Sequence, residues 1–270
     1  MTRLALFLLA VGTWVLTCAS LAGSAAEPAE VVARHLARFD SIATLALRVE
    51  RQTTQRGKTA IERWSFYQKG ADRFRIECEY PLRRTIVANP SELWEFVPEA
   101  KKAVRTDLSA MAAKDREALL RPVLRRVAVD GLRFDVPAAG ASLAYLGLEE
   151  VGGRPAHGIE CEQKDEKGAR SVRGWIDAER GVLLRTELVG TRGKKLAQTT
   201  GADFFEAAPG LWFPRSLTLQ DMSPRGASQT LTLKRVAVNG DLAEDLFTLK
   251  VPEGTEVARA GGEAPKIRTK

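Results

Sequence analysis

Apolar and polar residues alternate along most of this chain, in a pattern with a period of two. In residues 45–50 the apolar side chains occupy every second position, and residues 74–80 repeat the pattern with aromatic residues. Such alternation is typical of a β-strand with one buried face. Turns such as Gly152-Gly153 leave connections too short for parallel crossovers, so neighbouring strands are expected to pair antiparallel. The pattern predicts a mainly β protein with one large curved antiparallel sheet of about ten or eleven strands.

Two segments change to a helical spacing of apolar residues. Residues 29–39 form the first, and residues 108–126 form the second. Asp107 is expected to cap the second helix, and Pro122 to kink it or to start another one. We expect these few helices to cover the concave side of the sheet.

The first block of the chain, residues 1–26, differs from the rest. Arg3 precedes an apolar stretch over residues 4–21, and small residues fill positions 22–26, which is the pattern of a secretory signal peptide. An uncleaved anchor helix is one alternative. Lipidation of Cys18 is another, although the residue before it is bulkier than lipoprotein processing prefers. The signal-peptide pattern of residues 1–26 predicts that the protein is periplasmic. The alternative is a protein that is tethered to a membrane through a lipidated Cys18.

Composition and charge narrow the class of protein. Residues 27–257 are expected to form a single domain, and residues 258–270, which lack apolar periodicity, a disordered tail. The chain has 44% hydrophobic and 28% charged residues, which matches a globular protein and excludes collagen and coiled coils. Its net charge of +7 suits an anionic lipid surface, whereas nucleic acid is not a natural partner in the cell envelope.

Two cysteines, Cys78 and Cys161, remain after removal of the signal peptide. An oxidising compartment favours a disulfide between them. Two buried free thiols in neighbouring strands are the alternative, because the sequence does not supply the geometry that a disulfide requires.

The sequence contains no motif typical of an enzyme. It has two histidines, His35 and His157, and neither has a partner at metal-ligand spacing. We interpret His35 as a solvated surface residue. His157 could act as a base with Ser171 or Asp165, but a structural role is the preferred interpretation. We therefore predict no enzyme, no cofactor and no metal site.

Aromatic residues on neighbouring predicted strands are the more informative feature. They are expected to share one face of the sheet and to form an apolar surface larger than a monomer leaves exposed. Either the helices cover this surface as an ordinary core, or it lines a cavity for acyl chains. The candidate cavity residues are Trp64, Phe66, Phe74, Ile76, Tyr80, Ile86, Trp94 and Phe96.

Three blocks of the chain resemble the bacterial outer-membrane lipoprotein carriers, the LolA/LolB-like family. The blocks are residues 64–98 with Leu-Trp-Glu-Phe, residues 175–183 with Trp-Ile-Asp, and residues 211–255 with Leu-Trp-Phe-Pro and Asp-Leu-Phe-Thr-Leu. The resemblance implies an incomplete β-barrel around helices, with an apolar cavity that shields the acyl chains of a lipoprotein in the periplasm. It also implies an inner-membrane release complex or an outer-membrane acceptor as partners of a monomer.

The resemblance is imperfect at the lid that such carriers use. The family has a basic residue followed by Pro in a turn where this chain has Gly70 and Ala71. Lys69, Arg73 and Arg84 are the candidate lid or rim residues in its place. An alternative function for the same fold is an envelope-stress sensor that binds an anti-sigma-type membrane partner.

Overall fold

The computed structural model describes residues 27–127, 132–134, 142–165, 168–224 and 226–259. The predicted signal peptide and residues 260–270 of the predicted tail lie outside this part of the chain. None of the helices in the described ranges is long and apolar enough to cross a membrane.

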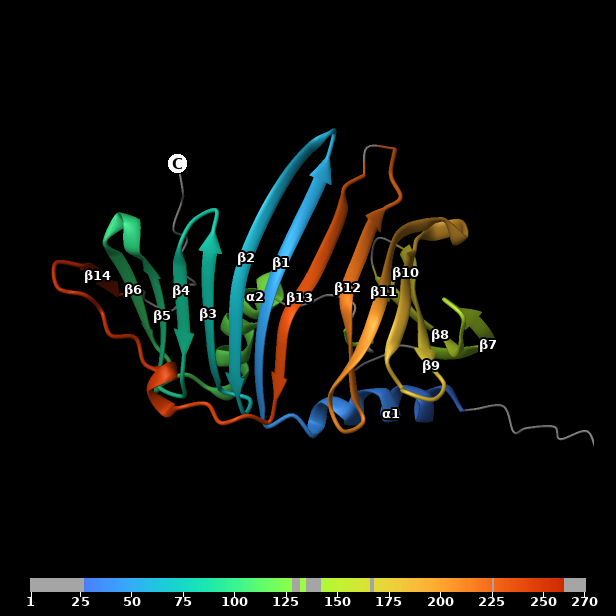
Figure 1. Cartoon of the computed structure of the whole chain (residues 1–270), viewed down its shortest axis with the longest axis horizontal. Coiled ribbons are helices and arrows are strands. Elements are labelled where there is room, and N and C mark those ends of the chain that lie inside the picture. Colours follow the sequence, from blue (N-terminus) through green and yellow to red (C-terminus); the bar gives the residue numbers. More distant parts are fainter. Residues whose placement is uncertain (1–26, 128–131, 135–141, 166–167, 225, 260–270) are drawn as a thin grey trace, which may run out of the picture.

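One open sheet of fourteen strands forms the body of the molecule (Figure 1), which confirms the predicted class with more strands than expected. Each strand pairs antiparallel with its neighbours, except that β14 runs parallel to β6. The strand order across the sheet is β14-β6-β5-β4-β3-β2-β1-β13-β12-β11-β10-β9-β8-β7. The strands are β1 (Thr44–Gln55), β2 (Lys58–Lys69), β3 (Arg73–Tyr80), β4 (Arg84–Ala88), β5 (Glu92–Val97), β6 (Lys102–Asp107), β7 (Ser142–Val151), β8 (Arg154–Asp165), β9 (Gly168–Asp177), β10 (Leu183–Val189), β11 (Lys195–Ala208), β12 (Leu211–Asp221), β13 (Ser228–Val238) and β14 (Glu256–Arg259).

The sheet consists of two meanders that meet at one seam. The strands β1 to β6 form the first meander, and β7 to β13 form the second. At the seam, β1 pairs with β13 from Leu45 opposite Val238 to Thr54 opposite Ser228. The pairing joins segments from both ends of the described chain into one continuous surface.

Two α-helices lie on one side of the sheet, which is here called the inner face; the opposite side is the outer face. The first is α1 (Pro28–Asp40), as the helical spacing predicts. The second, α2 (Ala113–Val127), begins five residues later than predicted. Asp107 does not cap it, because its carboxylate accepts hydrogen bonds from the backbone N–H and the hydroxyl of Ser109 at 2.9 and 2.5 Å.

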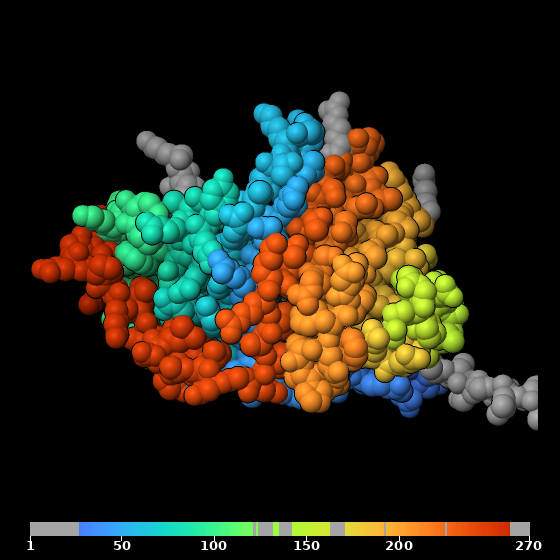
Figure 2. Space-filling model, viewed as in Figure 1, coloured from blue at the N-terminus to red at the C-terminus, as the bar shows by residue number. Residues whose placement is uncertain are grey.

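The segment after β13, residues 239–255, crosses the outer face and is here called the strap. Figures 1 and 2 show it passing in front of the first meander, on the side opposite α2. It contains the 3-10 helix η3 (Glu244–Phe247). The strap ends in β14, so Ala258 and Arg259 belong to the sheet rather than to the predicted disordered tail. The other 3-10 helices are η1 (Pro98–Ala100) and η2 (Thr191–Gly193).

Two apolar clusters occupy the inner face. The larger one lies on the first meander and on β12 and β13, with α2 over it. The smaller one lies between α1, Phe134 and strands β8 to β10. A third cluster, around Trp175, packs on the outer face of the second meander.

A candidate acyl-binding face on the inner side of the sheet

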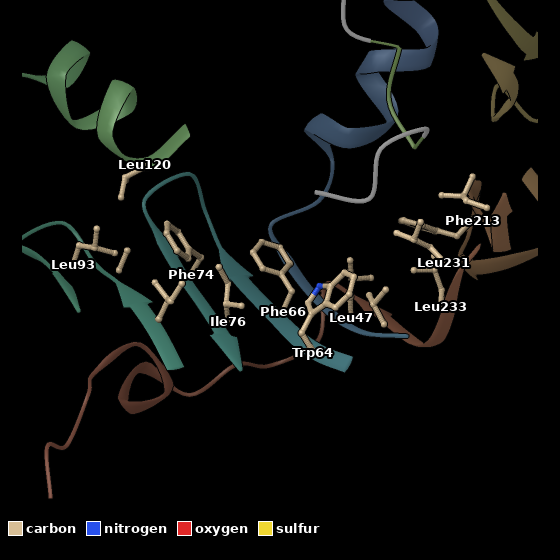
Figure 3. Packing of buried hydrophobic residues seen from close by; sticks show 14 of the residues in the cluster. Leu47, Trp64, Phe66, Phe74, Ile76, Leu93, Leu120, Phe213, Leu231 and Leu233 are labelled. Carbon is tan, nitrogen blue, oxygen red and sulfur yellow. The ribbon is translucent and has the colours of Figure 1, made fainter. Parts of the chain in front are cut away.

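The larger inner-face cluster is built by strand register. Phe66 lies opposite Ile76, and Ile76 lies opposite Ile86 on the next strand. Each of these three side chains is at most 8% exposed. Figure 3 shows the labelled side chains rising from their strands toward the side on which α2 lies. The register therefore stacks one apolar residue per strand into continuous rows.

Five of the eight predicted cavity residues meet in this cluster. Each comes from an inner-face position of β2, β3 or β4, as the alternation predicts. They are Trp64, Phe66, Phe74, Ile76 and Ile86.

Tyr80 does not belong to the cluster. A bulge between Arg63 and Trp64 shifts the register, so that Tyr80 lies opposite Arg63 and is 50% exposed. The Arg63 guanidinium lies 5.8 Å from the centre of the tyrosine ring. The prediction for Tyr80 was wrong because alternation alone does not reveal a bulge.

Trp94 and Phe96 lie on the outer face, which corrects a second prediction. In β5 the inner-face residues are Leu93, which is 3% exposed, and Glu95. Trp94 lies opposite Val87 on the outer face, where Arg105 stacks 5.7 Å from its ring. Both faces of β5 carry apolar residues, so its sequence alone does not determine which face points inward.

The strands β1, β12 and β13 add further apolar residues to the cluster, which were not among the predicted cavity residues. Their alternation was visible, but the pairing of β1 with β13 that brings them beside the aromatic strands was not. These residues are Leu47, Val49, Leu211, Phe213, Leu217, Leu231 and Leu233.

The helix α2 lies over this cluster. Over residues 113–120, Leu120 is the one buried side chain, at 7% exposed, and Figure 3 places it above Leu93 and Phe74. Leu119 and Val123 are partly buried against the same cluster. Over residues 113–120 the cover therefore contributes a single buried apolar side chain.

Two ion pairs border the apolar rows on the inner face. Arg84 donates to Glu95 at 3.1 Å, and Arg51 donates to Glu62 at 2.6 Å. Cys78 lies between them and directly opposite both Trp64 and Arg84. Burial raises the pKa of the Cys78 thiol, and the nearby Arg84 partly opposes that effect. The predicted rim residue Arg84 thus lies within the face, next to the aromatic cluster.

Lys69 and Arg73, the other predicted lid residues, point to the outer face and hold the strap. Lys69 Nζ lies 2.7 Å from Glu244 and donates to the carbonyl oxygen of Leu242 at 3.1 Å. Arg73 Nε lies 3.6 Å from Glu244. The hydrogen bond from Lys69 lowers the pKa of Glu244. These two residues are therefore separated by the sheet from the apolar rows.

The predicted disulfide between Cys78 and Cys161 is not formed. Both cysteines are free. Cys78 is on β3 and Cys161 on β8, and seven strands separate these two in the sheet order. With strands about 4.8 Å apart, no disulfide can span that distance.

The two histidines have structural partners. His35 is fully buried, not solvated as predicted; its Nδ1 lies 2.8 Å from the carbonyl oxygen of Gly181, and its Nε2 accepts from the backbone N–H of Phe134. His157 Nδ1 lies 3.0 Å from the hydroxyl of Tyr145, on the face opposite Ser171. Within the described ranges, no three His, Cys, Asp or Glu side chains are grouped so that they could hold a metal ion.

A separate polar groove of about 470 Å³ lies on the outer face, between the sheet and the start of the strap. It contains both charge signs, and Arg48 is paired there with Glu79 at 3.0 Å. Its lining residues are Thr44, Ala46, Leu47, Arg48, Ser65, Tyr67, Glu77, Glu79, Arg235, Ala237, Gly240, Asp241 and Leu242.

Known structures share this architecture. A domain from Vibrio parahaemolyticus described as an outer-membrane lipoprotein-sorting protein aligns with a TM-score of 0.56 at 14% identity, over 83% of this chain and 97% of its own. A LolA-superfamily protein from Nitrosomonas europaea aligns with a TM-score of 0.51 at 16% identity, and the alignment covers 81% of this chain and 97% of that protein. A DUF1329-family protein from Desulfovibrio piger aligns with a TM-score of 0.56 at 12% identity, and the alignment covers 81% of this chain and 94% of that protein.

The chain therefore has the fold of the lipoprotein-sorting and LolA-superfamily proteins, as the resemblance of its three sequence blocks predicts. Sequence comparison is less specific. A family model described as an uncharacterized-like protein matches residues 137–251. No curated protein matches the sequence.

Proposed function

We propose that this protein is an exported carrier that binds an acylated ligand, a lipoprotein or a lipid, on its inner face. The acyl chains would lie along the rows around Phe66 and Ile76. In this proposal the chain acts in the periplasm after removal of residues 1–26, without catalysis.

The observation that carries the proposal is the imbalance between the apolar rows and their cover. Among the described residues, fifteen buried members of the larger inner-face cluster come from outside α2, whereas Leu120 is the one buried side chain over residues 113–120 of the covering helix. Displacing Leu120 and its neighbours would expose a continuous apolar surface. Burying a 16-carbon acyl chain there contributes on the order of 10 kcal/mol, at about 0.8 kcal/mol per methylene, before the cost of moving the helix.

Two tryptophans on opposite faces allow a direct test. We would prepare single-tryptophan variants of the mature chain that retain either Trp64 or Trp94, with the other tryptophans replaced by Phe. A fatty acid with a nitroxide label on its chain is then titrated into each variant. Saturable quenching of Trp64 fluorescence, with little change at Trp94, is the expected result.

Two outcomes would contradict the proposal. Equal quenching at both tryptophans would indicate adsorption without a specific face, and no saturable quenching at Trp64 would indicate that the inner face is an ordinary core. Circular dichroism on both variants controls for folding.

The outer groove favours a second function, the binding of a protein partner from the membrane. Its mixed charges, including Arg235 and Glu77, suit a polar peptide better than an acyl chain. If this function holds, Arg235→Glu removes a specific crosslink to an envelope protein, Lys58→Glu at the exposed β1–β2 turn retains it, and neither changes quenching at Trp64. A crosslinking pattern that is the same in both variants would exclude the groove as the docking site.

A further inference from the structure

Trp64 carries a hydrogen-bond donor that the fold does not use. Its side chain is 3% exposed, and its indole Nε1 has no partner among the described residues; the same holds for Trp94 Nε1 on the outer face. Trp175, by contrast, donates from its indole to Glu149 at 3.1 Å. A buried donor without an acceptor is destabilising, so its presence in the middle of an apolar face requires an explanation.

The inner-face carboxylates on either side of Cys78, Glu62 on β2 beside Trp64 and Glu95 on β5, are committed to other partners. Glu62 accepts from Arg51, whose guanidinium also lies 4.9 Å from the centre of the Trp64 ring. Glu95 accepts from Arg84, which lies on the strand next to Cys78. Within the part of the chain that the structure describes, the indole N–H thus has no acceptor, and a bound ligand can supply one.

The charges of the two inner-face ion pairs also cancel. Arg51 with Glu62 and Arg84 with Glu95 give two positive and two negative groups, each paired within 3.1 Å. A strongly anionic group at this position would have to break one of these pairs and leave a carboxylate without its partner. A neutral acceptor, in contrast, can bond to the indole and leave both pairs intact.

From this arrangement we infer that Trp64 donates a hydrogen bond to the carbonyl oxygen of an acyl ester or acyl amide of the bound ligand. This inference rests on the proposed carrier function and narrows its ligand class. The alkyl chain extends from the carbonyl along the rows of Phe66 and Ile76. The carbonyl lies at Trp64, where the apolar rows meet the ion pairs. A chain joined through an ether lacks this acceptor and binds more weakly.

The test compares two ligands that differ at this one group. They are 1-palmitoyl-lysophosphatidylcholine, which has an ester, and 1-hexadecyl-lysophosphatidylcholine, which has an ether, both used below their micelle concentrations. We expect the mature protein to bind the ester about five- to tenfold more tightly, the range expected for one added hydrogen bond. Trp64→Phe should reduce this ratio to about one, while Trp94→Phe on the outer face should leave it unchanged.

A second measurement avoids substitution and any folding defect it causes. In protein labelled with 15N at the indoles, the ester should shift the Trp64 N–H resonance downfield relative to the ether, and the Trp94 resonance should not respond. Equal affinity for both ligands, or an ester preference that survives Trp64→Phe, would overturn the inference while leaving the carrier function standing. Failure of the wild-type protein to bind either ligand would instead count against the carrier function itself.

Discussion

At the scale of single residues, Asp177 organises the turn that anchors α1. Its carboxylate accepts from the side chain of Arg154 and from the backbone N–H groups of Glu179 and Arg180. Burial alone would raise the pKa of Asp177, but these hydrogen bonds outweigh it and lower the pKa below 3.8. The turn ends at Gly181, whose left-handed backbone (φ +63°) presents its carbonyl oxygen to His35.

Replacing this carboxylate should therefore have a pH-dependent cost. Because the folded pKa of Asp177 is lowered, its contribution to stability is present above about pH 4 and is lost as the pH falls through the folded pKa. We expect Asp177→Asn to lower the free energy of unfolding by about 2–3 kcal/mol at pH 7. Urea unfolding of both proteins should show this difference narrowing from pH 4 toward pH 2. A constant difference over that range would contradict the assigned role.

Gly174 gives a second prediction at this scale. A Cβ atom at this position would lie 2.6 Å from the ring of Phe134, which packs on the inner face of β9. Gly174→Ala should therefore destabilise the protein by about 1–3 kcal/mol through overpacking, as measured by urea unfolding. Gly240→Ala, where nothing lies within 4 Å, is the matched control and should change stability by less than about 0.5 kcal/mol. Similar losses in both variants would exclude overpacking as the cause.

Individual side chains were the least predictable level of the structure. Alternation placed Phe66 and Ile76 correctly because every second residue of β2 and β3 faces the cluster. It failed for Trp94, since β5 is apolar on both faces. The burial of His35 was also missed, because it depends on Gly181 and Phe134, residues far away in the sequence that donate or accept its hydrogen bonds.

At the scale of elements, the strap is held by one buried aromatic residue and by hydrogen bonds to its backbone. Phe247 in η3 is 2% exposed. Arg75 donates to the carbonyl oxygen of Leu246 at 3.1 Å, and Asn89 donates to that of Phe247 at 3.2 Å. The ion pair of Glu244 with Lys69 is more exposed, so it contributes less.

This difference should be measurable in two variants. Phe247→Ala is expected to lower the free energy of unfolding by about 3–5 kcal/mol because it removes a fully buried ring. Glu244→Gln should lower it by less than about 1 kcal/mol. Thermal or urea unfolding measures both, and a larger loss for Glu244→Gln would show that charge rather than packing holds the strap.

The helix α2 should open more readily than the strands beneath it. Hydrogen exchange monitored by mass spectrometry should show residues 113–120 exchanging well before β1 and β2, because Leu120 is their one buried side chain. Addition of an acyl ligand should change exchange in α2 and leave α1 unaffected. Exchange of α2 as slow as that of β1 would indicate a fixed cover rather than a movable one.

The elements themselves were mostly predictable. Strong alternation identified the long strands, and the spacing of Val31, Val32 and Leu36 identified α1. Short elements were missed: β6 has a weak pattern, and β14 is four exposed residues that form a strand only by pairing with β6. Such tertiary effects override local preference in short segments.

At the scale of the whole molecule, the strand spacing predicted the large antiparallel sheet, and the resemblance of three sequence blocks predicted that it does not close into a barrel. The position of each strand in the sheet did not follow. Nothing in the sequence indicates that seven strands lie between β3 and β8, so the prediction of a disulfide between Cys78 and Cys161 failed. Local periodicity carries no information about which distant strands pair.

The seam between β1 and β13 also determines the order in which the strand pairs of β1 can form. Hairpins such as β1–β2 can form within microseconds once both strands exist, but β1 finds its second neighbour only after residues 228–238 have been made. Until then its free edge, beside the apolar Leu47 and Val49, can pair with other chains. The period of greatest aggregation risk is therefore set by the rate at which the chain is synthesised and delivered, and not by the intrinsic speed of its folding.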